Sequence, residues 1–169
     1  MANIKRITKK RLGEILVQEG LVDKETVTRA LAKQKTSGKL LGRILIEDEV
    51  LSEEQIAKTL VQQFGIPFLR GDLYRISDRV KNMFPLPMLK KYDFVPLDII
   101  GKVIIILTAG IPDSEFFVQM EKISGCNVHL FIGTLSEVKQ IINDKFGEVA
   151  ETELSTIGQM LLGSEEEKE

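Results

Sequence analysis

The chain has 169 residues, of which 43% are hydrophobic and 28% charged, and its net charge at neutral pH is −2. This balance is typical of a soluble globular protein with one domain or two small ones, and it argues against a general polyanion binder. No apolar run reaches the roughly 18 residues that cross a bilayer, no secretion signal is present, and the single cysteine fits a reducing compartment, so we expect a cytoplasmic protein without membrane insertion.

Residues 1–65 are predicted to be helical. After the basic run KRITKKR (5–11), the segment TKKRLGEILVQEG is amphipathic and ends at Gly20, and Asp23 is placed to cap the helix that follows. Ser52 and Gln55 form a capping-box pattern for a later helix, which ends at Gly65.

This helical region contains an internal duplication. Residues 11–34 and 40–63 align without a gap at an offset of 29, and seven of the 24 positions are identical. Most other positions keep their polarity, as at Leu21/Val50 and Val27/Ile56. We therefore predict a helix–turn–helix unit that occurs twice.

Residues 66–84 have mixed polarity and are expected to form a connecting segment. The composition then changes to a small α+β pattern. It comprises a short helix at 85–93, a hairpin of strands FVPL (94–97) and KVIIILTA (102–109) around DIIG, a helix at 111–125, a third strand at 127–133 and a closing helix at 134–147. Residues 148–169 read as an acidic tail or linker, in which Leu154, Ile157 and Leu161 form a short apolar stripe. The predicted fold class is thus α+β: an all-helical duplicated subdomain at 1–65 followed by a three-stranded α/β sandwich at 85–147.

The residues needed for enzyme chemistry are missing from the sequence. The pairs Gly38-Lys39 and Gly101-Lys102 lack the upstream glycine of a phosphate-binding loop. Cys126 and His129 make a lone C-x-x-H, too few ligands for a closed zinc site, and His129 falls in the middle of a predicted strand. We therefore expect a non-enzyme that requires no cofactor.

DNA binding is an alternative that the helix–turn–helix units raise. The first unit carries a set of cations on its second helix: Lys24, Arg29, Lys33 and Lys35. The second unit offers Lys58 among five carboxylates at 47–49, 53 and 54, which would repel a duplex backbone. Nucleic acid is accordingly the less favoured partner.

The cluster Arg11–Leu12–Gly13 is the sharpest local feature. A glycine inside a helix costs about 1 kcal/mol relative to alanine, and here Gly13 recurs as Gly42. Close helix packing explains such a glycine, and so does a ligand that lies against exposed helix backbone. In the second case Arg11 would offer paired N–H donors to a phosphate or a guanine edge.

Residues 11–34 resemble the repeat of MshEN-type domains in three features: the pattern R-L-G-x-x-L, a glycine nine residues after the arginine, and a terminal L-x-x-Q. MshEN-type domains are the N-terminal domains of type II secretion and type IV pilus assembly ATPases of the GspE/PilB type. In that family two 24-residue motifs with a five-residue spacer form a cyclic di-GMP site, and here KTSGK separates 11–34 from 40–63. The resemblance continues through QQFGIPF (62–68), 85–109 and the final strand and helix, and covers about residues 8–147.

Position by position, the resemblance implies twelve ligand-binding residues: Arg11, Leu12, Gly13, Leu16, Gly20, Leu31 and Gln34 in the first motif, and Leu41, Gly42, Leu45, Leu60 and Gln63 in the second. The second motif departs at Leu40, where the family has arginine, and at Glu49, where it has glycine. Lys39 and Arg43 are the neighbouring cations that could compensate. The family's Ala-Asp-Pro after the second strand is AGIPD (109–113) here.

The resemblance implies a non-catalytic regulatory and docking module that couples a motor ATPase to the cytoplasmic part of an inner-membrane assembly partner. The family's ATPase domain is not among these 169 residues. The alternative is a cyclic di-GMP sensor that uses mainly the first repeat.

Overall fold

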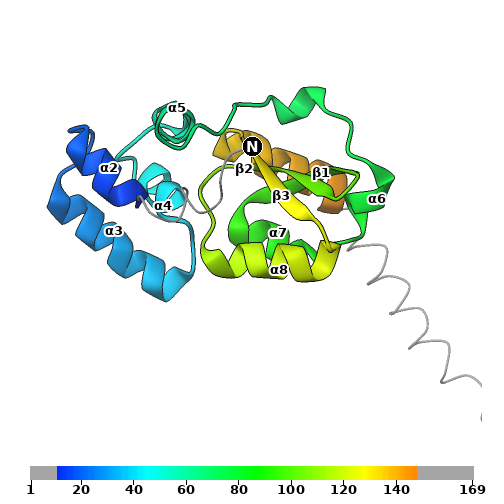
Figure 1. Ribbon diagram of the computed structural model, residues 1–169. Coiled ribbons are helices and arrows are strands. Elements are labelled where there is room, and N and C mark those ends of the chain that lie inside the picture. The colour runs from blue at the N-terminus through cyan, green and yellow to red at the C-terminus, as the bar shows by residue number, and fades with distance from the viewer. Residues whose placement is uncertain (1–10, 148–169) are drawn as a thin grey trace, which may run out of the picture.

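The computed structural model describes residues 11–147 of the chain. The predictions for the basic run at 5–10 and for the acidic segment 148–169, with its stripe of Leu154, Ile157 and Leu161, lie outside the described residues. A helical half and a three-stranded α+β half lie next to each other (Figure 1). The α+β fold class predicted from the sequence is therefore confirmed.

The helical half consists of two helix pairs, as the duplication predicted. Its helices are α2 (Leu12–Gln18), α3 (Lys24–Ser37), α4 (Leu41–Glu47) and α5 (Glu53–Phe64). Asp23 caps α3 by accepting a hydrogen bond of 2.6 Å from the Thr26 amide. Ser52 and Gln55 form the predicted capping box on α5, with hydrogen bonds of 3.1 and 2.9 Å. These side chains satisfy amides that a helix start leaves unpaired, which fixes where each second helix begins.

Gly13 allows α2 to lie directly against α3 and α4. A Cβ atom at Gly13 would lie 2.7 Å from Cγ1 of Val27 and 3.3 Å from Cδ2 of Leu41. Carbon atoms pack best at about 3.5–4.0 Å, so a methyl group has no room at this position.

Gly42 repeats this arrangement in the second unit. A Cβ atom there would lie 3.2 Å from Cγ2 of Ile56 and 3.7 Å from Cδ2 of Leu12. Ile56 and Leu12 are the duplication counterparts of Val27 and Leu41, so each glycine faces its own second helix and the opposite unit's first helix. Close helix packing therefore accounts for both glycines.

Polar contacts also cross between the two units. Gln63 of α5 donates a hydrogen bond to Glu19 at the end of α2, and Lys33 of α3 forms a 2.6 Å ion pair with Asp48 at the end of α4. Glu19 and Asp48 are counterparts in the duplication. Each second helix thus holds the end of the other unit's first helix, so the two units are interlocked.

The second half contains a mixed sheet in the order β1-β2-β3, with β2 antiparallel to β1 and parallel to β3. Its elements are η1 (Gly71–Leu73), α6 (Asp78–Lys81), α7 (Leu86–Tyr92), β1 (Phe94–Ile100), β2 (Val103–Thr108), α8 (Ser114–Ser124) and β3 (Asn127–Ile132), followed by a helix at 135–147. In Figure 1, α7 and α8 lie along one face of the sheet, and the helix at 135–147 lies on the other side.

Two details differ from the sequence-based expectations. The strand predicted at 94–97 continues to Ile100, so DII belongs to β1 and the hairpin turns at Gly101, whose φ is 60°. A register shift between Pro96 and Asp98 interrupts the alternation that would have revealed the longer strand. The segment 66–84 also contains η1 and α6, and its Phe68 forms a parallel bridge with Ile132 of β3.

The two halves share one hydrophobic core, which extends from Leu16 in α2 to Phe146 in the helix at 135–147. The domain boundaries drawn from the sequence stay a prediction. Within residues 11–147, no helix is long and apolar enough to cross a membrane.

An ionic cluster connects α4 to the second half. Arg43 reaches Asp93, a residue only 1% exposed at the end of α7, over 2.9 Å, and it also bonds to Glu47 over 2.8 Å. Burial raises the pKa of Asp93, whereas hydrogen bonds from Lys39 and Arg43 lower the pKa of Glu47 to about 2. Lys139 of the helix at 135–147 approaches Glu47 to 3.6 Å. These charges fix α4 against the sheet half.

Candidate functional site

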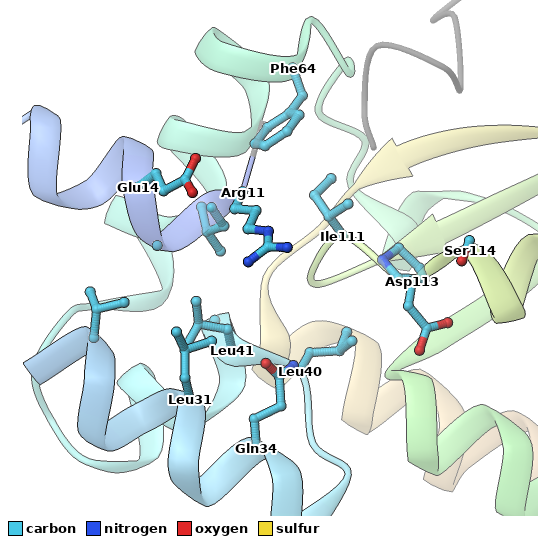
Figure 2. Close-up of a pocket in the computed structure, with 15 residues that line it drawn as sticks. Arg11, Glu14, Leu31, Gln34, Leu40, Leu41, Phe64, Ile111, Asp113 and Ser114 are labelled. Atoms are coloured by element: carbon cyan, nitrogen blue, oxygen red, sulfur yellow. The ribbon is translucent and has the colours of Figure 1, made fainter. Parts of the chain in front are cut away.

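The candidate site is a cavity of about 480 Å³ between the two halves (Figure 2). The starts of α2 and α4, one side of α3, the end of α5 and the β2–α8 loop surround it. Its size falls in the range of small-molecule pockets, roughly 300–1,000 Å³.

The structure brings together seven of the twelve residues that the resemblance assigned to a ligand. Those that line the cavity are Arg11, Leu12, Gly13, Leu31, Gln34, Leu41 and Gly42. The other five do not line it. Leu16, Leu45 and Leu60 are fully buried in the core, Gly20 ends α2 with a φ of 69°, and Gln63 bonds to Glu19.

Arg11 is the cationic side chain of the site. Its guanidinium points into the cavity from the start of α2 (Figure 2), and it is the one cation among the described residues that line the cavity. Gln34 of α3 adds an amide, while Leu31 and Leu41 provide apolar surface. Leu31 is 40% exposed, so its side chain is accessible to a ligand in the cavity.

Leu40, the duplication counterpart of Arg11, lines the same cavity. It is 8% exposed and packs against Gly110, where a Cβ atom would lie 2.9 Å from Leu40 Cδ1. The neighbouring cations Lys39 and Arg43 do not line the cavity, and both bond to Glu47. Neither one restores a charge at this wall.

Glu49 and Gly20 occupy equivalent places outside the cavity, each just after the first helix of its unit. Both take left-handed backbone conformations, with φ of 56° and 69°. Glu49 therefore has a backbone conformation that favours glycine. The same left-handed conformation is sufficient to explain the glycine at position 20.

The residues that the sequence did not single out come mainly from the β2–α8 loop. Ile111, Pro112, Asp113 and Ser114 form the wall opposite α3, and Phe64 at the end of α5 lies above Arg11 in Figure 2. Glu14 and Val27 complete the lining. The one sequence signal for this wall was the altered AGIPD segment at 109–113. Nothing in the spacing indicated that Phe64 faces the cavity.

Cys126 and His129, the two residues of the C-x-x-H pattern, have structural roles. The His129 ring lies edge-on to Phe131 at 5.1 Å, and the Cys126 thiol is buried and donates to the Ser124 carbonyl oxygen. Among residues 11–147, no group of three or more His, Cys, Asp or Glu side chains is arranged to hold a metal ion.

A family model for the MshEN domain matches residues 64–151, which is more than half of the chain. The chain belongs to the MshEN domain family. The match begins at the end of α5, so it supports the sheet half of the MshEN fold and does not include the repeated helices. No curated protein matches the chain.

Solved structures extend the likeness to the helical half. MshE with cdg, that is cyclic di-GMP, superposes with a TM-score of 0.58 at 23% identity, over 82% of this chain and 100% of that chain. The N-terminal domain of XpsE, in two crystal forms, gives TM-scores of 0.58 and 0.60 at 20% and 19% identity, over 79% and 83% of this chain and 92% and 93% of the XpsE chains. At these identities the likeness establishes a shared MshEN fold.

Proposed function

We propose that this MshEN domain is a non-catalytic regulatory and docking module of the kind found in type II secretion and type IV pilus assembly ATPases. It would act in the cytoplasm, held at the inner membrane by the cytoplasmic part of an assembly protein, and couple that protein to a motor ATPase domain. The observation that carries this proposal is the match of the fold to the N-terminal domain of XpsE over about four-fifths of the chain.

The duplication suggests where a protein partner could dock. Leu21 and Val50 are counterparts, each placed just after a left-handed residue, and each side chain is exposed, at 36% and 37%. Two apolar side chains on equivalent turns of interlocked units offer a partner a repeated contact.

Biolayer interferometry with the cytoplasmic domain of the cognate inner-membrane assembly protein tests this function. We expect binding of the intact chain and a loss of at least about tenfold in Leu21→Asp and Val50→Asp, because a buried unpaired carboxylate costs more than 1.4 kcal/mol. Val118→Asp is the matched control, since Val118 is 65% exposed on α8 in the other half. The absence of binding at about 100 μM would reject the docking function.

A second function, cyclic di-GMP binding, is supported by the cavity itself, which gathers seven of the twelve residues that the resemblance assigned. The Arg11 guanidinium could pair with a phosphate or with the O6 and N7 acceptors of guanine, and the leucines provide an apolar floor for a base. In MshE, the related fold was solved with this ligand.

Calorimetric titration with cyclic di-GMP tests the second function. Arg11→Ala should weaken binding by roughly tenfold to a hundredfold, the equivalent of about 1.5–3 kcal/mol for a charged hydrogen bond. Arg29→Ala is the matched control, because Arg29 lies on the same half of the molecule, bonds to Thr26 and does not line the cavity. No heat at high micromolar ligand would reject cyclic di-GMP as the ligand.

A further inference from the structure

The cavity is built on two equivalent helix starts that carry different side chains. Arg11 and Leu40 are the N-cap residues of α2 and α4, and both have extended backbones, with φ/ψ of −83°/131° and −66°/144°. The Leu-Gly pairs that follow them are identical and also line the cavity. The duplication thus presents the same backbone twice, but with a guanidinium on one side and an isobutyl group on the other.

This difference makes the electrostatics of the cavity one-sided. Arg11 is the one cation in the described lining, whereas Glu14 and Asp113 are carboxylates. Leu40 is packed on the β2–α8 loop, so the wall opposite Arg11 has no charged donor. A second anionic group would meet apolar surface and the Asp113 carboxylate there, and the transfer of an unpaired charge to such a wall is unfavourable.

The opposite wall suits an uncharged flat group. Leu40 and Ile111 form this wall, and the Phe64 ring borders the same space from above Arg11 (Figure 2). A nucleobase can stack on an aromatic ring and contact aliphatic side chains with little requirement for hydrogen bonds, and a stacked base contributes substantially to nucleotide affinity.

We infer that Leu40 makes the pocket a half-site, which recognises a nucleotide with a single phosphoryl group: a purine nucleoside monophosphate with its phosphate at Arg11 and its base against the apolar wall. This inference rests on the nucleotide-binding function proposed above for the same cavity, and it specifies the ligand class. The second nucleotide of cyclic di-GMP then adds little, because its phosphate finds no partner. Leu40 is the residue that determines this specificity.

Calorimetric titrations of the intact chain with GMP, AMP and cyclic di-GMP test the inference. We expect GMP or AMP to bind within about threefold of cyclic di-GMP. Leu40→Arg should tighten cyclic di-GMP binding by about tenfold or more, because it supplies the cation that the second phosphate lacks, and it should not tighten the monophosphates, whose base would lose its contact with the Leu40 side chain. Leu73→Arg adds the same charge at a residue that is 76% exposed and does not line the cavity, and it should alter neither affinity.

Two results would overturn the inference. If cyclic di-GMP binds the unchanged chain more than about tenfold tighter than both monophosphates, the half-site is wrong while the cyclic di-GMP function stands. If none of the three nucleotides binds at millimolar concentration, the half-site and the nucleotide function both fail. Should Leu40→Arg not fold, as circular dichroism would reveal, Arg11→Ala decides: it must weaken the monophosphates and cyclic di-GMP by similar factors, and unequal factors reject the half-site.

Discussion

Gly13 and Gly42 are counterparts in the duplication, but alanine should have different effects at the two positions. At Gly13 the new methyl carbon would lie 2.7 Å from Cγ1 of Val27, a side chain that is 7% exposed and, being β-branched within a helix, is confined to one rotamer. At Gly42 the nearest atom is Cγ2 of Ile56 at 3.2 Å, which a shift of a few tenths of an ångström relieves.

The magnitudes follow from two opposing effects. Alanine gains up to about 1 kcal/mol over glycine in helix propensity, and overpacking a rigid core costs about 1–3 kcal/mol. At Gly13 the steric cost should exceed the gain, and we expect Gly13→Ala to lower the free energy of unfolding by about 1–2 kcal/mol. At Gly42 the two effects nearly cancel, so Gly42→Ala should stay within about 0.5 kcal/mol of the unchanged protein.

Urea unfolding followed by circular dichroism measures both variants, with an unchanged m-value as evidence that the denatured state is the same. In a thermal scan Gly13→Ala should melt roughly 2–8 °C lower, at about 2–4 °C per kcal/mol. The double variant Gly13→Ala/Val27→Ala removes the clash and should be more stable than the sum of its single variants predicts. If Gly13→Ala is as stable as the unchanged protein, or less damaging than Gly42→Ala, the packing explanation of the glycines is wrong.

Three further predictions concern other parts of the fold. Glu49→Gly should raise the free energy of unfolding by about 0.5–1 kcal/mol, because Glu49 has a φ of 56° that glycine adopts without strain. Gly20→Ala should lower the free energy of unfolding by about 1 kcal/mol for the same reason. Urea titration measures both variants, and a destabilising Glu49→Gly would contradict the backbone explanation. Hydrogen bonds from Lys39 and Arg43 lower the pKa of Glu47 from 4.5 to about 2, so its ionised form stabilises the fold above pH 4.5 and this stabilisation is lost as the pH falls from 4.5 to 2. Glu47→Gln should therefore flatten the stability curve in that pH window, and an unchanged curve from unfolding at several pH values would show that the cluster is energetically unimportant. Ser52→Ala should cost about 1 kcal/mol in the same urea assay by removing the cap of α5, and a loss below about 0.3 kcal/mol would show that the capping box contributes little.

Much of the fold could be predicted from the sequence because its signals are local. Asp23, Ser52 and Gln55 act within one helical turn, and Gly20 and Gly65 take the left-handed conformations that end their helices. The apolar runs of β2 and β3 were also recognisable from a few neighbouring residues. By contrast, α6 has only four residues, too few for any periodicity to develop, and the Phe68 bridge to β3 depends on a contact 64 residues away in the chain.

Only part of the candidate site could be predicted, again because the signals in a sequence are local. Arg11, Gly13 and Gln34 belong to one repeat, so their spacing marks them as a group. Phe64 and Asp113 reach the cavity only after the sheet half packs on the helices, and no periodicity in the sequence connects them to Arg11. Conversely, Leu16, Leu45 and Leu60 share the spacing of the motif but serve the core, because a repeated pattern cannot distinguish residues that hold the scaffold from those that face a ligand.

The interlocking of the two helical units has an evolutionary consequence. Each first helix packs against the opposite unit's first helix, and its end bonds to the opposite unit's second helix, as in the contacts of Gly13 with Leu41 and of Gln63 with Glu19. One unit expressed alone would leave these surfaces uncovered and self-complementary, which is the condition for a twofold symmetric dimer. Fusion of two such units into one chain would have ended the constraint that both copies change together. Arg11 and Leu40 would then descend from one ancestral position, which diverged to a different side chain in each unit.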